Sequence, residues 1–508
     1  MCGIVAWYTP SSEAVTSDVL ATGPAMLARL AHRGPDDTGQ ARVGERAWLG
    51  HNRLSIVGPA NGRQPLGETG PWSMVCNGEI YNDAELRESL PGHRFTTASD
   101  NESALALLAG QGPRALDRLE GMWALCAATP DGRFVAARDR LGIKPLYWAR
   151  ADGLYYFASE MRAFPLAVQR AVEMFPPGCW WTPDDGLVRF ADAVTAAPVQ
   201  DGLTAAELES RTRGVLVDSV RRHLMADVEV GVFLSGGLDS SIVAAVAAAE
   251  YAREGRRLKT FAVGVDGSPD LRAAREVAGF LGTDHHETVF DAAQAVAALD
   301  DVIASVESFD AGLIRSAVPN WFLAELASHH VKAVLTGEGA DELFAGYGYY
   351  HDRHHDPATL HCELQRTIEL LHGLNLQRCD RVTMAHGLEA RVPFLDSRVV
   401  DHAMSLPDAV KSLDADGLEK GHLRRAFTGW LPDRLLWRPK LEFGTGSGAA
   451  DLLTPYWNQH IGDAELAERR DDPVTELRSK EELAYYRAFR RALPEVRPAA
   501  VLTRFAVA

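Results

Sequence analysis

The chain has 508 residues, of which 46% are hydrophobic and 24% are charged, a composition typical of an ordinary globular protein. This length exceeds one typical core, so we expect two or three domains. The formal net charge of −17 argues against a nucleic-acid partner, because a phosphate backbone needs a basic face. The most apolar run, residues 242–249, is far shorter than the roughly 20 residues of a membrane span, so we expect no membrane partner.

Six cysteines are scattered along the chain without a Cys-x-x-Cys pair or a zinc-binding spacing. Free thiols of this kind are typical of a reducing compartment, and no segment resembles a signal peptide. The sequence therefore predicts a cytoplasmic protein. We expect five of the six to be buried small residues, namely Cys76, Cys126, Cys179, Cys362 and Cys379.

Cys2 is the most informative residue of the chain. If Met1 is removed, Cys2 carries both a thiol and a free α-amino group, and an amine with a pKa near ~8 can accept the thiol proton. A nucleophile with its own base is the arrangement of the N-terminal nucleophile hydrolases. The alternative is that Cys2 is an ordinary small residue at the start of a strand. The choice between these two interpretations depends on motifs further along the chain.

Up to about residue 199 the chain alternates short apolar runs with turn residues, a texture that predicts antiparallel sheets flanked by helices. Asn77-Gly78, Asp131-Gly132 and Pro176-Pro177-Gly178 are the clearest turn signals. The predicted strands are residues 3–8, 48–56, 72–76, 122–128, 134–138 and 154–158, and helical patterns cover 25–31 and 101–109.

Residues 190–205 are rich in small residues and lack a regular apolar pattern, which predicts a linker. We therefore expect one domain over residues 1–199 and another over residues 200–508. Beyond the linker, strands at 228–234, 258–265 and 331–335 are each followed by a helix. Strand and helix alternation of this kind predicts an α/β domain with a parallel sheet, and from about residue 360 the chain is mostly helical.

The segment Ser235-Gly236-Gly237-Leu238-Asp239-Ser240 follows a predicted buried strand and opens a helix. At the carboxyl end of a parallel strand, such a turn can wrap a polyanion with backbone N–H groups and hydroxyls. The pattern is that of the pyrophosphate-loop ATPases, which cleave ATP to AMP and pyrophosphate. The chain lacks a Walker-type loop, and the alternative is a simple helix-capping turn.

A second glycine-rich turn, residues 336–342, carries three carboxylates just after another apolar strand. Asp239 and Asp341 are candidate Mg²⁺ ligands, because this ion prefers carboxylate oxygens together with substrate phosphates. Lys420 could supply positive charge to an adenylate, although a lysine in a helical segment is more often solvated.

Two sets of motifs, one in each half, resemble those of one enzyme family. The first set covers residues 1–4, 32–36, 53–57, 77–82, 99–100 and 138–147, and it resembles the class II glutamine amidotransferase domain. The second set covers residues 235–241, 267–271, 337–342, 387–396 and 437–440, and it resembles the asparagine synthetase domain. The chain thus resembles the glutamine-hydrolysing asparagine synthetases from residue 1 to about residue 490. The implied fold is an α+β N-terminal nucleophile amidotransferase domain followed by an α/β pyrophosphate-loop ATPase domain.

The resemblance implies roles for residues of the first domain. The Cys2 thiolate would attack the side-chain amide of glutamine, giving a thioester and ammonia, with Asn77 and the Gly78 N–H as the oxyanion hole. The implied glutamine-binding residues are Arg53 for the α-carboxylate, Glu79 and Asp100 for the α-ammonium group, and Ile56, Val57, Asn77 and Gly78 around them.

In the second domain the resemblance implies a site for ATP and Mg²⁺ beside the acceptor carboxylate. Glu338 matches the acid tied to formation and breakdown of the acyl-adenylate, and Lys420 is the accompanying cation. The implied reaction converts aspartate, ATP, glutamine and water into asparagine, AMP, pyrophosphate and glutamate. A homodimer formed through the N-terminal domains and an apolar ammonia tunnel are further implications. The implied ATP-binding residues are Leu234, Ser235, Gly236, Gly237, Asp239, Ser240, Val263, Thr336 and Gly337.

Two stretches depart from the family pattern. Gly312 and Leu313 stand where two threonines are usual, and residues 442–448 replace a Ser-Asp-Gly pattern with a more glycine-rich stretch that lacks the Asp of that pattern. Loss of hydrogen-bonding groups beside a substrate can change which acceptor is used, so a different carboxylic acid is the closest alternative to aspartate.

Two further readings stay open. The first is a β-lactam synthetase of the same fold, which uses no ammonia. Cys2 counts against this alternative, and so does Glu338, because that branch usually has a tyrosine at this position. A non-catalytic scaffold would not need every catalytic position filled. His351–Asp356 is expected to be a solvated segment rather than a metal site.

Overall fold

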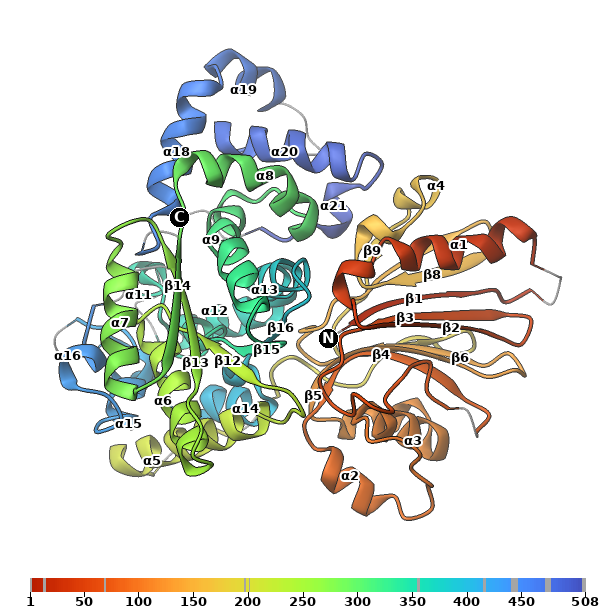
Figure 1. Cartoon of the computed structure of the whole chain (residues 1–508), viewed down its shortest axis with the longest axis horizontal. Helices are drawn as coiled ribbons and strands as arrows, with labels where there is room; N and C mark the ends of the chain where they lie inside the picture. The colour runs from red at the N-terminus through yellow and green to blue at the C-terminus, as the bar shows by residue number, and fades with distance from the viewer. Residues whose placement is uncertain are drawn as a thin grey trace.

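The computed structural model describes residues 2–11, 15–67, 70–195, 198–200, 202–353, 357–413, 417–439, 446–470 and 477–504. They form two halves that meet at the beginning of the first strand (Figure 1). Within these residues, no helix combines the length and the apolar content needed to cross a membrane.

The N-terminal half contains two antiparallel sheets. The first has the order β2-β3-β1-β8-β7-β9 and the second β11-β10-β6-β5-β4. Buried side chains of both sheets, among them Ile4, Leu49, Val75, Phe134 and Phe157, form the core between them. The strands of the first sheet are β1 (Cys2–Tyr8), β2 (Asp37–Val43), β3 (Ala47–Arg53), β7 (Tyr147–Ala151), β8 (Leu154–Ala158) and β9 (Glu173–Met174), and those of the second are β4 (Ser73–Ile80), β5 (Gly121–Ala128), β6 (Phe134–Arg138), β10 (Cys179–Thr182) and β11 (Gly186–Arg189).

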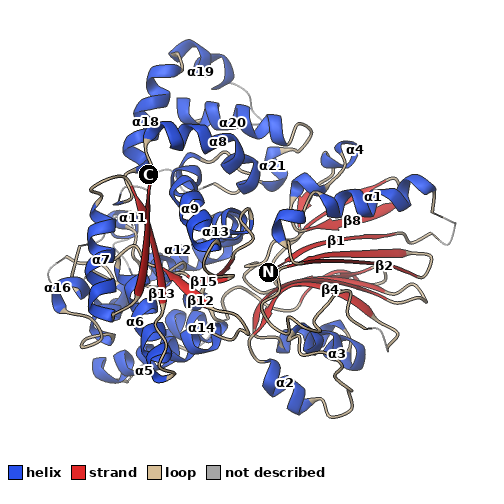
Figure 2. Ribbon diagram, in the orientation of Figure 1, coloured by secondary structure: helices blue, strands red, loops and turns tan. Residues whose placement is uncertain are grey.

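Helices cover the outer faces of these two sheets, which gives four layers (Figure 2). α1 (Ser17–Ala28) buries Met26 and Leu27 near Trp48 of the first sheet. α3 (Asn101–Gln111) buries Leu105 and Leu108 with residues of the second sheet. The layered arrangement confirms the predicted α+β fold of this half.

The C-terminal half is built on a parallel sheet of order β14-β13-β12-β15-β16. From β12 the chain continues through β13 and β14 on one side, and β15 then pairs with β12 on the other side. The strand order therefore reverses between β12 and β15, which is where open α/β sheets bind ligands. The strands are β12 (Val230–Phe233), β13 (Lys259–Gly264), β14 (Asp284–Val289), β15 (Ala333–Leu335) and β16 (Glu389–Arg391).

Helices lie on both sides of the parallel sheet and fill the rest of this half (Figure 2). α13 lies at the boundary with the N-terminal half, and all ten of its residues are buried. The described helices beyond α1 and α3 are α2 (Asp83–Ser89), α4 (Leu166–Gln169), α5 (Ala205–His223), α6 (Leu238–Arg253), α7 (Pro269–Leu281), α8 (Ala292–Val306), α9 (Ala311–Ser328), α10 (Ala340–Leu343), α11 (Gly348–Arg353), α12 (Pro357–Leu370), α13 (Asn375–Met384), α14 (Ser397–Ser405), α15 (Gly421–Ala426), α16 (Asp433–Leu436), α18 (Ala449–His460), α19 (Asp463–Arg470), α20 (Lys480–Ala492) and α21 (Pro498–Val501).

Most predicted strands are present, with two corrections to other predictions. Asn77-Gly78 lies inside β4 instead of forming a turn, since β4 continues to Ile80 and pairs with β5 over its whole length. Cys362 of α12 is exposed, whereas the other five cysteines are buried. In the predicted linker, residues 196, 197 and 201 lie outside the described residues.

Candidate active sites in the two halves

Cys2 is the first residue of β1 and lies at the boundary between the two halves (Figure 1). Its backbone N–H donates to Asn77 Oδ1 at 2.9 Å, and its carbonyl accepts from Arg33 Nε at 3.0 Å. The side chain is buried, and burial raises the pKa of the Cys2 thiol. The thiol is therefore protonated near neutral pH, so a nucleophilic role requires a nearby base.

Asn77 and Gly78 lie beside Cys2 in the middle of β4. Asn77 is fully buried, and its Nδ2 donates no hydrogen bond to any described residue. An unpaired buried donor is costly, which favours a ligand atom as its partner. Gly78 has φ +150° and an added Cβ would lie 1.9 Å from the Met122 carbonyl oxygen, so only glycine fits here.

Arg53 ends β3 directly opposite Cys2 in the sheet. Its guanidinium donates to the carbonyl oxygens of Val57, Gly58 and Pro59 at 3.1, 2.7 and 3.2 Å. The predicted pocket residue Ile56 is buried and Val57 half-buried. Arg53 thus holds the loop after β3 against the strand that carries Cys2.

Two buried carboxylates flank this region. Asp100 Oδ2 accepts from the Ile80 N–H at 2.6 Å, and burial raises the pKa of Asp100 to about 7. Burial, followed by the charges of Glu389 and Asp100, raises the pKa of Glu79 well above its usual range. Glu79 Oε2 accepts no hydrogen bond from the described residues, and Arg391 of the other half lies 3.5 Å away. The two acids are poised to ionise when a cation binds between them.

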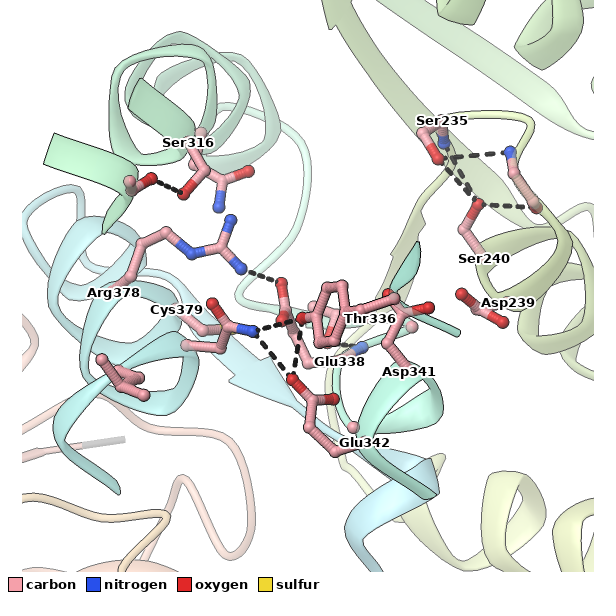
Figure 3. A pocket seen from close by; sticks show the side chains of 18 of the residues that line it. Ser235, Asp239, Ser240, Ser316, Thr336, Glu338, Asp341, Glu342, Arg378 and Cys379 are labelled. Carbon is pink, nitrogen blue, oxygen red and sulfur yellow. Dashed lines mark hydrogen bonds and ion pairs between the residues drawn. The ribbon is translucent and has the colours of Figure 1, made fainter. Parts of the chain in front are cut away.

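The Ser235–Ser240 turn joins β12 to α6, at the switch point of the parallel sheet. Ser235 Oγ accepts from the Gly237 N–H at 3.3 Å and lies 3.1 Å from Ser240 Oγ, which closes the turn (Figure 3). Gly236 has φ +74°, and a Cβ there would lie 2.5 Å from Ala273 of α7. The turn ends at the N-terminus of a 16-residue helix, a favourable position for phosphate.

Lys420 joins the two glycine-rich turns. Its Nζ lies 2.6 Å from Asp239 and 2.5 Å from Asp341, and its side chain is only 2% exposed. Burial alone would lower its pKa, but the two carboxylates raise the pKa of Lys420 above its ordinary value. Lys420 is therefore a buried cation at the phosphate end of the site and not a solvated lysine.

Glu338 forms an ion pair with Arg378 of α13 on the side of the turn facing the other half (Figure 3). The Arg378 side chain is 5% exposed and that of Glu338 is 20% exposed. Glu338 and Thr336 both line the cavity, so the ion pair holds the Glu338 side chain at the cavity wall. Arg378 carried no signal in the sequence, because it lies in a polar stretch without a recognisable motif.

One cavity of about 640 Å³ connects these groups. It is lined by every predicted ATP-binding residue, by Glu338 and Asp341, and by Lys420. Within the described ranges, no cluster of three or more His, Cys, Asp or Glu is arranged to hold a metal ion. The converging Asp239 and Asp341 carboxylates are the oxygen donors that Mg²⁺ would require.

The two departures from the family pattern differ in their surroundings. Ala311 and Gly312 line the cavity, whereas Leu313 is fully buried in the core and does not line it. Leu313 is therefore a packing residue, and only Gly312 faces the substrate space. Residues 442–445 of the second departure, and His354, His355 and Asp356 of the histidine segment, lie outside the described residues.

Comparisons with known proteins match both halves of the chain. The glutamine amidotransferase domain profile matches residues 1–176, and the asparagine synthase profile matches residues 211–364 and 352–502. Asparagine synthetase [glutamine-hydrolyzing] of Asparagus officinalis is 38% identical over 97% of this chain and 86% of its own length. The corresponding proteins of Arabidopsis thaliana (number 3) and Sandersonia aurantiaca are 39% and 38% identical, over 92% and 98% of this chain and 83% and 97% of their own lengths.

We predict that Lys420→Met lowers AMP formation about 100-fold, whether glutamine or free ammonia supplies the nitrogen. The reason is that Asp239 and Asp341 would face bound ATP without a protein cation. Glutamine hydrolysis should stay within about twofold of the unmodified protein. Coupled AMP and glutamate assays measure both rates. Lys259→Met is the matched control, since it removes an ion pair with Glu229 at 2.7 Å outside the cavity. An AMP rate within a few-fold of normal for Lys420→Met would contradict the role of this cation.

Proposed function

We propose that this chain, which belongs to the family of glutamine-hydrolysing asparagine synthetases, forms asparagine by transferring the amide nitrogen of glutamine to the side-chain carboxylate of aspartate. The chain is a ligase of two joined sites, one that hydrolyses glutamine and one that uses ATP. The observation that carries the proposal is the single cavity in which both glycine-rich turns, Glu338 and Lys420 meet, next to the half that holds Cys2.

In the first site, the Cys2 sulfur attacks the side-chain carbonyl carbon of glutamine. The thiol proton passes to the α-amino group that removal of Met1 creates on Cys2. Asn77 Nδ2 and the Gly78 N–H bind the developing oxyanion, and the unpaired state of that buried amide supports this role. The Cys2 α-ammonium group returns the thiol proton to the leaving nitrogen, and ammonia departs. Water then hydrolyses the thioester, which releases glutamate and restores the thiol.

Glutamine is held by its amino-acid end. We assign its α-ammonium group to Glu79 and Asp100 and its α-carboxylate to Arg53, with Ile56 and Val57 beside it. The raised pKa values of the two acids support this assignment, because a bound ammonium group would restore their ordinary ionised form.

In the second site, ATP lies across the switch point of the parallel sheet. We assign adenine to Leu234 and Val263, the phosphates to the 235–240 turn, and the ribose and α-phosphate to Thr336 and Gly337. Asp239 and Asp341 would hold Mg²⁺, which supplies charge neutralisation to the phosphates when bound. Lys420 supplies further positive charge where pyrophosphate departs.

The acceptor carboxylate attacks the α-phosphate of ATP, forming an acyl-adenylate and pyrophosphate. Ammonia from the first site then attacks the acyl carbon, and Glu338 accepts a proton from it. Asparagine and AMP are released. Ammonia has to cross the boundary between the halves near α13 before it is protonated by water.

Aspartate is the proposed acceptor, and another carboxylic acid is the second candidate. The second candidate is favoured by Gly312, which presents no side chain where it lines the cavity and so leaves room for a different acid. We further propose domains over 1–199 and 200–508, a cytoplasmic location and a homodimer formed through the N-terminal domains.

The experiment that tests the proposal measures AMP and pyrophosphate release with ATP, Mg²⁺ and glutamine, comparing aspartate with other carboxylic acids. We expect rapid aspartate-dependent AMP release and asparagine in the products by mass spectrometry. Glutamine hydrolysis without aspartate-dependent AMP would contradict aspartate as acceptor and favour the second candidate.

A Cys2→Ala variant is expected to lose glutamine-dependent synthesis while ammonia-dependent synthesis stays within about twofold, because the nucleophile acts only on glutamine. Glutamate and AMP assays with each nitrogen source test this. Glutamine hydrolysis retained in the variant would refute the assignment of Cys2.

Glutamine binding is expected to weaken as the pH falls. The pKa of Asp100, about 7 in the free protein, makes it ionised above and protonated below that pH, and only the ionised form attracts an α-ammonium group. Calorimetry on the non-hydrolysing Cys2→Ala variant should show the dissociation constant rising about tenfold from pH 8 to pH 6. Adding Asp100→Asn should weaken binding at pH 8 and flatten the profile. A constant affinity over this range in Cys2→Ala alone would contradict the assignment.

A further inference from the structure

Arg33 connects the nucleophile to both halves of the molecule. Its side chain is fully buried, and its Nε donates to the Cys2 carbonyl oxygen at 3.0 Å. One carboxylate partner, Glu160 at 2.8 Å, belongs to the N-terminal half. The other, Asp380 at 2.9 Å, belongs to α13 of the C-terminal half. The positive charge of the guanidinium is therefore paired with both carboxylates only when α13 packs against the N-terminal half.

The contact between Arg33 and Asp380 uses both terminal nitrogens of the guanidinium. Nη1 lies 2.9 Å from Asp380 Oδ2, and Nη2 lies 3.3 Å from Oδ1. Such a two-point contact fixes orientation as well as distance, so Asp380 follows small shifts of the Arg33 side chain. Because Arg33 also holds the Cys2 carbonyl, the start of β1 and α13 are linked through one side chain.

The same helix reaches the second site. Arg378, two residues before Asp380, forms the ion pair with Glu338 (Figure 3). Arg381, the next residue after Asp380, donates to the Ser159 carbonyl oxygen at 2.5 Å, and Ser159 Oγ accepts from the Ile4 N–H of β1 at 3.0 Å. Through Arg33 and Ser159, Asp380 and Arg381 of α13 are thus linked to β1, and Arg378 of the same helix contacts the proton-accepting acid of the second site.

We propose that Asp380 is a positioning residue that couples the two sites: through Arg33 it holds α13, and with it Arg378 and Glu338, in register with the backbone of Cys2. This inference rests on the proposed two-site reaction. Its consequence is that glutamine bound at Cys2 and the state of Glu338 influence each other, and linkage requires such an effect to be reciprocal.

If Asp380 had only a structural role, its ion pair with Arg33 would be equivalent to other ion pairs that join the two halves. Arg140 and Asp401 form such a pair at 2.8 Å, with side chains 20% and 38% exposed. Within the part of the chain that the structure describes, neither residue forms a hydrogen bond or ion pair with α13 or with Cys2. Asp401→Asn is therefore a matched control that removes a charge from the same boundary without touching the link.

The test uses the full chain and compares Asp380→Asn with Asp401→Asn. Glutamate and AMP are measured in the same reaction with glutamine, ATP, Mg²⁺ and aspartate. We expect the ratio of glutamate to AMP to rise at least threefold in Asp380→Asn and to stay unchanged in Asp401→Asn. Ammonia-dependent AMP formation, and glutamine hydrolysis without ATP, should remain within twofold in both variants.

An unchanged ratio in Asp380→Asn would overturn the proposal, whether or not the ammonia-dependent rate falls. Asp380→Glu keeps the charge and should give a ratio between those of the unmodified protein and Asp380→Asn. If the proposed function fails, ammonia-dependent AMP formation is absent from the unmodified protein, an outcome distinct from an unchanged ratio in an active variant.

A measurement on the unmodified protein covers the case in which Asp380→Asn does not fold. Alkylation of Cys2 by a chloroketone analogue of glutamine should change the hydrogen exchange of amides 375–384 and leave that of α14, which contains Asp401, unchanged. Identical exchange in α13 before and after alkylation would overturn the proposal. This readout does not depend on which acid is the acceptor.

Discussion

A fully buried guanidinium, that of Arg33, sits at the meeting point of the two halves and takes one carboxylate from each. Removing one partner of a buried ion pair costs about 3–5 kcal/mol, because the remaining charge is left without compensation. Separation of the halves would impose this cost at Arg33 and again at Arg381, which faces both Glu160 and Glu307. The relative placement of the halves is therefore set by charge compensation as well as by apolar packing.

The same rule organises the second site. Lys420 is buried between Asp239 and Asp341, and Arg378 is buried against Glu338, so these three carboxylates at the cavity are matched by buried cations. Glu342 also lines the cavity but forms no ion pair with a cation of the described residues, and burial raises its pKa to about 7. It instead accepts hydrogen bonds from Tyr347 and Asn375 at 2.8 and 3.0 Å. Buried cations and neutral hydrogen-bond donors thus share the task of compensating the carboxylates at this cavity.

The sequence predicts the two sheets, the parallel domain and the turns around Ser235 and Thr336, because apolar runs and glycine-rich junctions are local signals. It fails for α13, where Arg378, Asp380 and Arg381 are 4%, 4% and 0% exposed. A stretch with so many charges usually indicates a solvent-exposed face, and each charge here is buried against a partner outside the helix, from 40 residues away for Arg378 to 347 for Asp380. The prediction of a turn at Asn77-Gly78 is wrong because a local signal is overridden by strand pairing. The pair has the chemistry of a hairpin turn, yet the pairing of β4 with β5 continues through it, and the unusual backbone of Gly78 serves the neighbouring Cys2 instead.

The two positions of the first departure, Gly312 and Leu313, differ in whether they line the cavity. Leu313 of α9 is fully buried, so its apolar side chain stabilises packing and does not line the cavity. Asp310 caps this helix by accepting from the Leu313 N–H at 3.0 Å, which places the first turn of α9, and Gly312 with it, against the cavity wall. The missing side chain at 312 thus changes the shape of the site without disturbing the helix that bears it. Gly312 is therefore the described position of this departure at which the shape of the cavity wall is set.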